Sequence, residues 1–441
     1  MPSSALISSR FRLCVAADSA GRPTAAPRRR PIAVVLLLAA VCSLAGRDAA
    51  AQQFTYRGYA DGAVFFYPRT TPIDATQTVG EAIVRVDPSL SFSRALLIAG
   101  SFDARMDTHD QTAHSWDVSF SDRGILRPAL AVRRLSAVLS TGPLTLEVGK
   151  QFVRWGKTDM MSPSDRFAPR DYLTVIDNDV LAVTAARLTV AGASDSVEVV
   201  YSPRLTPSRT PLLYQRWAPH DVATAPLPIV DQGSTFPKKP QFGARWNHIG
   251  QKAEYSLSFF DGYDHQPVVE GGLSATGQTI DIRRRYSALR TYGADLVVPL
   301  STVALRAEFA AFDAPDADAN EYVLYVLQAE RQWREWLFIA GYSGEKMTHD
   351  RNVVAFSADR GLAEALLVRA SYNLGGDRSF IIEAVGRYNG DGVYSKAEYS
   401  RVVARNLRVA LRFVAIGGKD TDFLGQYRRN SFSAGHIRYN F

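Results

Sequence analysis

The sequence predicts an all-β fold, a transmembrane, antiparallel, up-and-down β-barrel of about 18 strands (16–18). Three observations support this expectation. Segments throughout residues 52–441 alternate apolar and polar side chains with a period of two, as strands with one apolar face do. These segments average about 11 residues, the length that a tilted membrane-spanning strand needs. Their connections alternate between tight turns and long loops, which is typical of transmembrane barrels.

The composition agrees with a strand-based membrane protein. The chain has 441 residues, of which 46% are hydrophobic and 22% charged, so it has ample apolar material and no signature of disorder. Its 19 Tyr and 22 Phe are residues that favour strands and membrane interfaces. The mean hydropathy of −0.11 is too polar for a helical membrane bundle. The single long apolar run lies near the N-terminus, which argues against a polytopic helical transporter.

The N-terminal segment 1–51 has the features of a secretory signal peptide and leader. Three arginines at 28–30 precede an apolar run at 32–45, and the small residues at 49–51 provide a cleavage site. We expect the mature chain, and the barrel, to begin near Gln52. The part before the arginines is long for such a leader, which suggests a start codon assigned too early.

Removal of this leader changes the charge and cysteine counts. The leader contains 7 of the 51 basic residues and 2 of the 44 acidic ones, so the mature chain has a net charge of only about +2. The basic precursor is therefore no argument for nucleic-acid binding, and we expect none. Cys14 and Cys42 both lie in the leader, which excludes disulfides, thiol catalysis and Cys-ligated metals from the mature chain. A lipoprotein attached through Cys42 is disfavoured, because Val41 stands where a small residue is expected.

The alternating segments define the expected strands. In 407–413, for example, Leu, Val, Leu and Phe share one face and two Arg lie on the other. The expected strands are 54–66, 82–92, 95–104, 128–140, 144–153, 180–190, 194–202, 241–249, 253–262, 288–299, 302–313, 321–333, 336–345, 362–373, 378–389, 393–404, 407–417 and 432–441.

The connections place the two rims of the barrel. Tight turns are expected near residues 93–94, 141–143, 192–193, 250–251, 300–301, 334–335, 375–377 and 405–406. Long loops are expected at 67–81, 105–127, 154–179, 203–240, 263–287, 346–361 and 418–431. Two links on the long side, 314–320 and 390–392, are short. An even number of strands places both ends of the barrel at the rim of short turns.

The last expected strand alternates and ends on an aromatic residue. Ile437, Tyr439 and Phe441 share one face. This pattern resembles the C-terminal signature of Gram-negative outer-membrane β-barrels, which the barrel-assembly machinery reads. The resemblance implies location in the bacterial outer membrane, export across the inner membrane, and assembly with periplasmic chaperones and that machinery. Outer-membrane lipid would surround the barrel.

Closure into a barrel follows from the lipid environment, because every backbone polar group must be paired there. A soluble β-solenoid or sandwich is the alternative, but it would bury the apolar face and place fewer aromatic residues at strand ends. The aromatic residues expected in interface girdles are Phe65, Phe66, Tyr67, Tyr201, Phe259, Phe260, Trp333, Trp336, Tyr342 and Tyr388.

The polar face of the strands should line the lumen, which in a barrel of this size is wide enough for water. Guanidinium groups on this wall would favour anions mildly. The alternative is that these charges pair across strands and only keep the lumen hydrated. The expected cations are Arg85, Arg245, Arg306, Arg369, Arg387, Arg408, Arg412 and Arg438, and the expected anions are Asp87, Glu147, Glu198, Glu254, Glu308 and Glu383.

The loop at 154–179 is unusually rich in Arg, Asp, Pro and aromatic residues. Such a loop can fold into the barrel and narrow it, or it can form a rigid external cap with internal Arg–Asp pairs. In the first case Arg154, Lys157, Arg166 and Arg170 would act as a filter. The expected constriction residues are Arg154, Trp155, Lys157, Asp159, Asp165, Arg166, Arg170 and Asp171.

This region also carries a family resemblance. A G-[RK]-Q-x-x-x-W-G segment is followed by a P-x-D element and a P-R-D element; the matching residues are Gly149, Lys150, Gln151, Trp155 and Gly156, then Pro163, Asp165, Pro169, Arg170 and Asp171. The pattern resembles outer-membrane barrels of the alginate-export and porin superfamily, whose members are passive channels. One type exports an anionic polysaccharide through an Arg-rich lumen, whereas the expected lumen here also contains acids.

The resemblance implies a channel for passive diffusion of small hydrophilic solutes, mildly anion-preferring and without a cofactor. The alternative is a dedicated exporter or importer of one anionic or bulky solute such as a polysaccharide. Porins with 16 to 18 strands commonly form homotrimers, so the resemblance leaves a homotrimer open. It names neither the solute nor the gating.

Other function classes have weaker support. An outer-membrane enzyme would need catalytic residues, but no G-x-S-x-G elbow or H-E-x-x-H pair accompanies the seven histidines, so we expect no catalytic residue. His109 and His114 with nearby aspartates have no specific metal-ligand spacing, so we expect no metal site. Residues 52–81 are too few for the plug of a TonB-dependent receptor. An adhesin barrel remains open because the loop at 203–240 is long and rich in proline.

Overall fold

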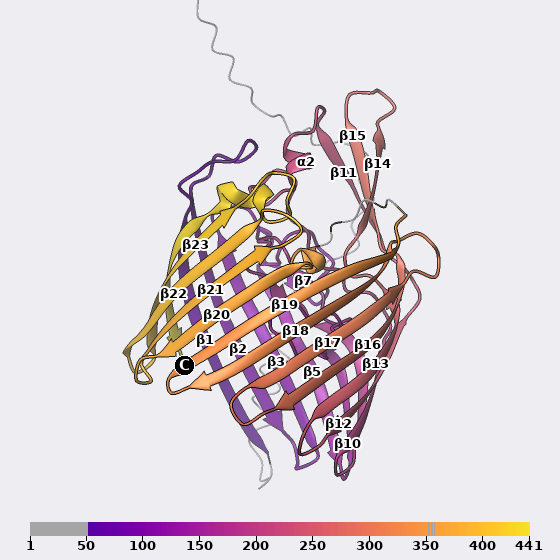
Figure 1. The fold of residues 1–441 in the computed structure, drawn as a ribbon, viewed down its shortest axis with the longest axis vertical. Helices are drawn as coiled ribbons and strands as arrows, with labels where there is room; N and C mark the ends of the chain where they lie inside the picture. Colours follow the sequence, from indigo (N-terminus) through magenta and orange to yellow (C-terminus); the bar gives the residue numbers. More distant parts are fainter. Residues whose placement is uncertain (1–51, 352, 354–355, 357) are drawn as a thin grey trace, which may run out of the picture. The chain divides into compact units, whose positions relative to one another are not determined.

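The computed structural model describes residues 52–441 except residues 352, 354–355 and 357. The expected signal peptide at 1–51 lies outside the described residues. Eighteen antiparallel strands form one closed sheet, in which β1 pairs with β2 on one side and with β24 on the other (Figure 1). The expected all-β barrel and its strand number are confirmed.

The strands of the barrel agree closely with the expected segments. The largest differences are that β2 begins at Thr78 instead of residue 82 and that β19 ends at His349 instead of residue 345. The barrel strands are β1 (Gln53–Phe66), β2 (Thr78–Ser91), β3 (Leu96–Asp107), β5 (Leu130–Thr141), β6 (Leu144–Gln151), β9 (Val183–Ala191), β10 (Asp195–Ser202), β12 (Gln241–Ile249), β13 (Glu254–Tyr263), β16 (Ala288–Pro299), β17 (Ala304–Asp313), β18 (Glu321–Trp333), β19 (Trp336–His349), β20 (Ala365–Asn373), β21 (Arg378–Arg387), β22 (Val393–Ala404), β23 (Leu407–Gly417) and β24 (Phe432–Asn440).

The seam between the first and last strands closes the barrel. Gly62 of β1 faces Ile437 of β24 in an antiparallel register. Beyond the last ladder pair, the amide of Gly58 donates to the carbonyl of Phe441 at 2.8 Å, and the amide of Phe441 donates back at 2.9 Å. Each barrel strand therefore has a partner on both sides, as a hydrocarbon environment requires.

The two faces of the sheet differ as the alternation predicted. Val64, Leu257 and Phe413 are 56–58% exposed on the outer face, whereas the carboxylates Glu147 and Glu308 are 3% and 2% exposed on the inner one. An apolar exterior and a polar interior are the arrangement of a membrane barrel.

Some residues expected in the aromatic girdles lie inside instead. Tyr67 and Phe260 are buried, and Phe65 packs against the buried cluster that contains Tyr67. These three positions are a correction to the expected girdle. The physical reason is that chain segments fill part of the lumen, so inward aromatic side chains find apolar partners there.

Several elements lie outside the barrel wall. The regions expected only as loops contain a separate sheet of β11 (Ile229–Thr235), β15 (Ile280–Arg285) and β14 (Val268–Leu273), which extends beyond the rim of long loops (Figure 1). The shorter elements are β4 (Val118–Ser119), β7 (Arg170–Asp171), β8 (Asp179–Val180), α2 (His220–Ala223), η2 (Ala358–Arg360) and η3 (Gly425–Asn430). Among the described residues, no helix combines the length and apolar character needed to cross a membrane.

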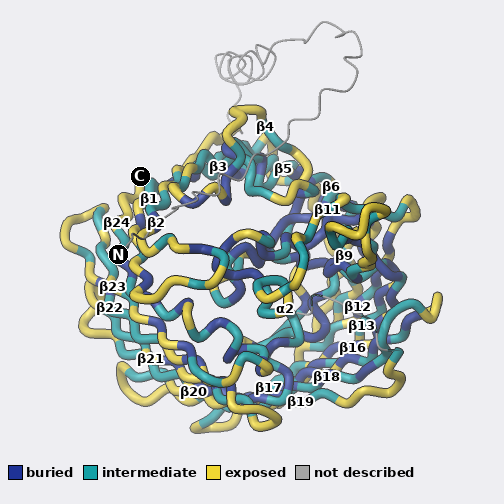
Figure 2. The backbone as a smooth tube through the Cα atoms, turned by 90° about the horizontal axis from the view of Figure 1, so that it is seen from above, coloured by how far each residue is buried: buried dark blue, intermediate teal, exposed yellow. Residues whose placement is uncertain are grey.

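The interior of the barrel contains packed chain rather than only open space. Viewed from above, segments of backbone cross the ring of strands, and many of them are buried (Figure 2). One inner cluster joins Trp155 and Phe167 of the loop at 154–179 to Val183, Val200 and Phe260 of the wall. This loop therefore packs against the inner surface of the barrel.

Candidate functional site

The loop that follows β6 is fixed to the inner wall through Glu308 of β17. Both carboxylate oxygens of Glu308 accept hydrogen bonds from this loop: from the amide of Lys157 at 3.0 Å, and from the amide and hydroxyl of Thr158 at 3.2 and 2.8 Å. The amide and hydroxyl of Ser164 donate at 2.9 and 2.8 Å. One buried carboxylate thus satisfies five donors, which compensates for its removal from water.

Trp155 lies at the start of the loop, against the strands on one side of the lumen. Its indole Nε1 donates to Glu198 of β10 at 2.5 Å, and its carbonyl accepts a bond from Arg245 of β12. The ring packs edge-on against Phe167 with centroids 5.5 Å apart. A side chain at Gly243 would collide with both rings, so glycine on β12 leaves the space for them.

Two aspartates shape the next part of the loop. Asp165 accepts bonds from the amides of Trp155 and Gly156 and from Arg154 Nε, the last at 2.5 Å. The amide of Asp159 donates to the side chain of Gln328 on β18 at 2.9 Å, and Asp159 Oδ2 accepts from Gln328 Nε2 at 2.7 Å. The loop is therefore braced internally and also bonded to the wall.

The loop reaches the opposite wall at Asp177. Arg412 of β23 lies 2.5 Å from Asp177 and 2.8 Å from Glu398 of β22. Because its other anchors are on β10, β12, β17 and β18, the loop crosses the lumen from one wall to the other. The geometry therefore places the loop inside the barrel and excludes the external cap.

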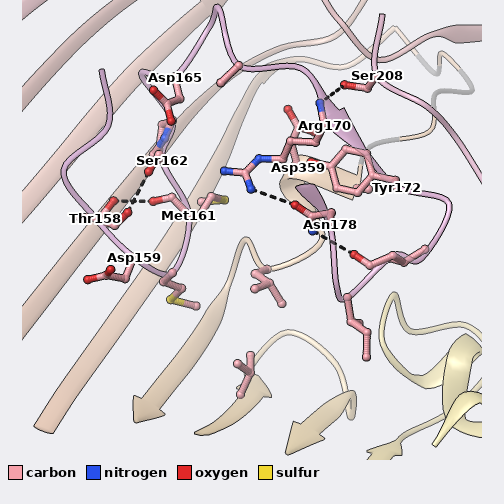
Figure 3. Close-up of a pocket in the computed structure, with 18 of the residues that line it drawn as sticks. Thr158, Asp159, Met161, Ser162, Asp165, Arg170, Tyr172, Asn178, Ser208 and Asp359 are labelled. Atoms are coloured by element: carbon pink, nitrogen blue, oxygen red, sulfur yellow. Dashed lines mark hydrogen bonds between the residues drawn. The ribbon is translucent and has the colours of Figure 1, made fainter. Parts of the chain in front are cut away.

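Two cavities flank this loop, and Asp177 borders both of them. The first has a volume of about 460 Å³ and is bordered by residues of the loop, among them Asp159 and Arg170 (Figure 3). Arg369, Glu383 and Lys396 of β20, β21 and β22 also border it. The second has a volume of about 410 Å³ and lies toward β1, β2, β3 and β24, with Arg85 among its lining residues. Both cavities are lined mainly by polar and charged groups.

Asp171 joins three loops. Its carboxylate accepts bonds from Arg127 at 3.0 and 3.1 Å and from Arg209 at 3.0 Å, and all three side chains are largely buried. Burial alone would raise the pKa of Asp171, but the charges of Arg127 and Arg209 hold this pKa well below its usual range. The loop is thus fixed to the segments around residues 127 and 209.

Arg170 differs from the other cations of the loop. Its guanidinium donates to Asn178 at 2.9 Å and borders the first cavity (Figure 3). Among the described residues, no carboxylate lies within ion-pair distance of it. A partly exposed guanidinium with free donors and no counter-charge can bind an anion in the cavity.

The other expected filter residues are neutralised or buried. Arg154 pairs with Asp165, and Lys157 lies 3.4 Å from Glu254. Arg166 is largely but not fully buried; it lies 3.8 Å from Asp359 and over the ring of Phe312. Burial raises the pKa of Asp359, so this pair lies in a region that disfavours charge.

Most of the charged residues on the inner wall form ion pairs with each other. This is the alternative in which the charges of the lumen pair and only keep it hydrated. Of the eight arginines expected in the lumen, only Arg408 lacks a carboxylate within ion-pair distance among the described residues, and it donates to Ser400 at 3.1 Å. The pairs are Arg85–Asp103, Glu147 with Arg134 and Arg187, Arg245–Asp295, Arg306–Glu330, Arg369–Glu383, Arg387–Asp422, Arg412–Glu398 and Arg438–Asp61.

Several functional residues are absent from the sequence-based set. Asp103 and Asp295 lie on the inner face opposite predicted arginines, and the period of two in their strands could have found them. Lys396 lies 3.6 Å from Glu383 and borders the first cavity, so the lumen also contains lysine. No sequence pattern pointed to Asp177, because a loop has no periodicity from which the direction of its side chains can be inferred.

Among the described residues, no group of three or more His, Cys, Asp or Glu side chains could hold a metal ion. In the segment 107–114, which contains two histidines, His109 Nε2 lies 2.7 Å from Asp74.

The fold is similar to those of solved outer-membrane porins. OccAB4 of Acinetobacter baumannii matches with a TM-score of 0.51 and 10% identity, over 89% of this chain and 98% of that one. A BenF-like porin from Pseudomonas fluorescens matches with 0.53 and 10%, over 88% and 98%. OpdQ of Pseudomonas aeruginosa matches with 0.51 and 8%, over 88% and 98%. No family model and no curated protein matches the chain.

Proposed function

We propose that residues 52–441 form a passive diffusion channel for small hydrophilic solutes in the bacterial outer membrane, after export directed by residues 1–51. The observation that carries this proposal is the loop at 154–179, which crosses the lumen between Glu308 and Arg412. The similarity of the fold to outer-membrane porins supports the same function. The strand pattern, closed seam and apolar exterior favour the same membrane location.

The size of the cavities beside the loop favours small solutes. Volumes of about 460 and 410 Å³ correspond to small-molecule sites rather than to a polymer conduit. Because the loop is bonded to both walls, a bulky polysaccharide would have to displace it. This arrangement disfavours the alternative of a dedicated polysaccharide exporter.

We infer a mild anion preference that depends on few residues. Most charges of the inner wall cancel in cross-strand pairs, so the wall keeps the lumen hydrated without strong selection. Arg170 is the cation of the loop that remains available at a cavity. Such a channel works down a gradient and needs no enzymatic chemistry or cofactor.

Assembly would use the C-terminal strand. Ile437, Tyr439 and Phe441 are exposed on the outer face of the barrel, where the barrel-assembly machinery and then lipid can contact them. We propose these three side chains as the assembly signal, with a homotrimer as one form of the inserted protein.

Replacing Arg170 with glutamine is expected to reduce the anion preference about twofold, because the substitution removes the unpaired charge beside the first cavity. The measurement is the reversal potential of single channels in a planar bilayer under a salt gradient. The matched control is Arg290→Gln, which removes an arginine paired with Asp261 at the opposite, outer face of the wall. An unchanged reversal potential in R170Q would show that Arg170 does not select ions.

A further inference from the structure

Two arginines face each other on the outer surface of the barrel. Arg378 of β21 and Arg401 of β22 are direct cross-strand partners, and both are exposed. Their sequence neighbours Ser379 and Ser400 lie on the inner face, where their hydroxyls are 2.8 Å apart, so the two guanidinium groups must be outside. In the described part of the chain, neither guanidinium has a carboxylate within ion-pair distance.

Two facing arginines on the outer surface destabilise the barrel unless an anion lies between them. Like charges that are directly opposite on one face destabilise a strand pair. Arginine on the lipid side of a barrel also costs free energy unless it reaches the interface. Arg378 begins its strand at the rim of short turns. In a bilayer the rim of a barrel lies at the level of the head groups, where phosphates are found. A phosphate between the two guanidinium groups would remove both costs.

An apolar path continues from the arginine pair along the same strands. Phe380 faces Tyr399 two residues along the strands from the arginine pair, and Ile382 faces Ala397 two residues further. Ala397 in turn faces Phe413 of β23. Ile382, Ala397 and Phe413 line an outer groove of about 510 Å³. Four residues of strand place this groove about 13 Å from the arginines, within the half-thickness of a hydrocarbon core.

We propose that Arg378 and Arg401 bind the phosphate of a phospholipid from the leaflet on the side of the short turns. One acyl chain of this lipid lies over Phe380 and Tyr399 and enters the groove between Ile382 and Phe413. Charge complementarity selects the head group, and the groove beside small Ala397 receives the chain. The inference rests on the proposed function only in placing the barrel in a membrane.

The test is native mass spectrometry of the detergent-solubilised barrel titrated with phosphatidylglycerol. The double variant Arg378→Gln/Arg401→Gln is expected to retain the lipid about tenfold more weakly than the wild type. Ala397→Phe, which fills the groove and keeps both charges, should also weaken retention. Arg331→Gln is the matched control, because Arg331 lies on the outer face near the same rim but faces Phe338 instead of a second arginine.

Two outcomes would overturn the proposal. One is equal lipid retention by the double variant and the wild type. The other is displacement of the lipid by excess inorganic phosphate, which would indicate a site for free anions. Channel conductance of the same preparations separates this proposal from the proposed function: lost lipid binding with normal conductance supports the lipid site and leaves the channel intact. Normal lipid binding in a silent wild-type barrel would contradict the channel alone.

Discussion

Replacing Glu308 with alanine is expected to raise the single-channel conductance about two- to threefold, because residues 157–164 of the loop would detach from the wall and widen the passage. Glu308 accepts five hydrogen bonds from this loop and is buried on the inner wall. Without the carboxylate, the two hydroxyls and three amides would lose their common partner. Each buried donor left without a partner costs on the order of 1–3 kcal/mol.

The control for this experiment is Glu254→Ala. Glu254 also lies on the inner face but makes only a 3.4 Å contact with Lys157, so its loss should leave the conductance nearly unchanged. Heat-modifiable migration in gels shows whether each variant still forms a barrel. A folded E308A barrel with wild-type conductance would show that Glu308 does not keep the loop in the lumen.

Replacing Asp171 with asparagine is expected to destabilise the loop assembly by about 3–5 kcal/mol, because Arg127 and Arg209 would lose the charge between them. The measurement is the protection of the loop from protease in the folded barrel, together with the heat-denaturation midpoint. Asp110→Asn is the control, since Asp110 is exposed and pairs only with the exposed His114. Wild-type protection in D171N would contradict this role.

Asp171 should also make the stability of the loop depend on pH. The pKa of Asp171 is lowered in the folded state by Arg127 and Arg209, so its contribution to stability is present above the ordinary carboxyl pKa. This contribution is lost only as the pH falls through the lowered, folded-state value. Loop protection in the wild type should therefore persist from neutral pH to about pH 4, near the pKa of a free aspartate. Loss of protection well above that pH would contradict the assignment.

The strands could be predicted from sequence because lipid imposes a strict rule on them. A stretch such as 407–413, with apolar residues at every second position, has only one orientation that satisfies both lipid and water. In the structure, Glu308 bonds to the loop inside the barrel and Arg369 pairs with Glu383 of the neighbouring strand. The aromatic residues at the membrane interface were harder to predict. Phe260, for example, lies near a strand end, yet it packs against the loop residue Phe167 inside the barrel.

The partners inside the lumen could not be predicted, because a loop has no period. Both Arg166 and Arg170 border the first cavity, and sequence alone did not indicate that Arg166 pairs with Asp359 whereas Arg170 bonds to Asn178. Nor could it indicate that Asp177 reaches Arg412, more than two hundred residues further along the chain. The sheet of β11, β14 and β15 was missed because its strands are short and lie within long polar loops.

An open passive channel narrowed by an internal loop should admit small solutes and exclude larger ones. The swelling of liposomes that contain the refolded chain measures this directly, in isotonic solutions of solutes of increasing size. We expect rapid swelling in a monosaccharide or a small organic acid, and swelling rates that fall steeply for oligosaccharides. Vesicles with a folded barrel that do not swell in any small solute, or that admit oligosaccharides as fast as monosaccharides, would contradict this expectation.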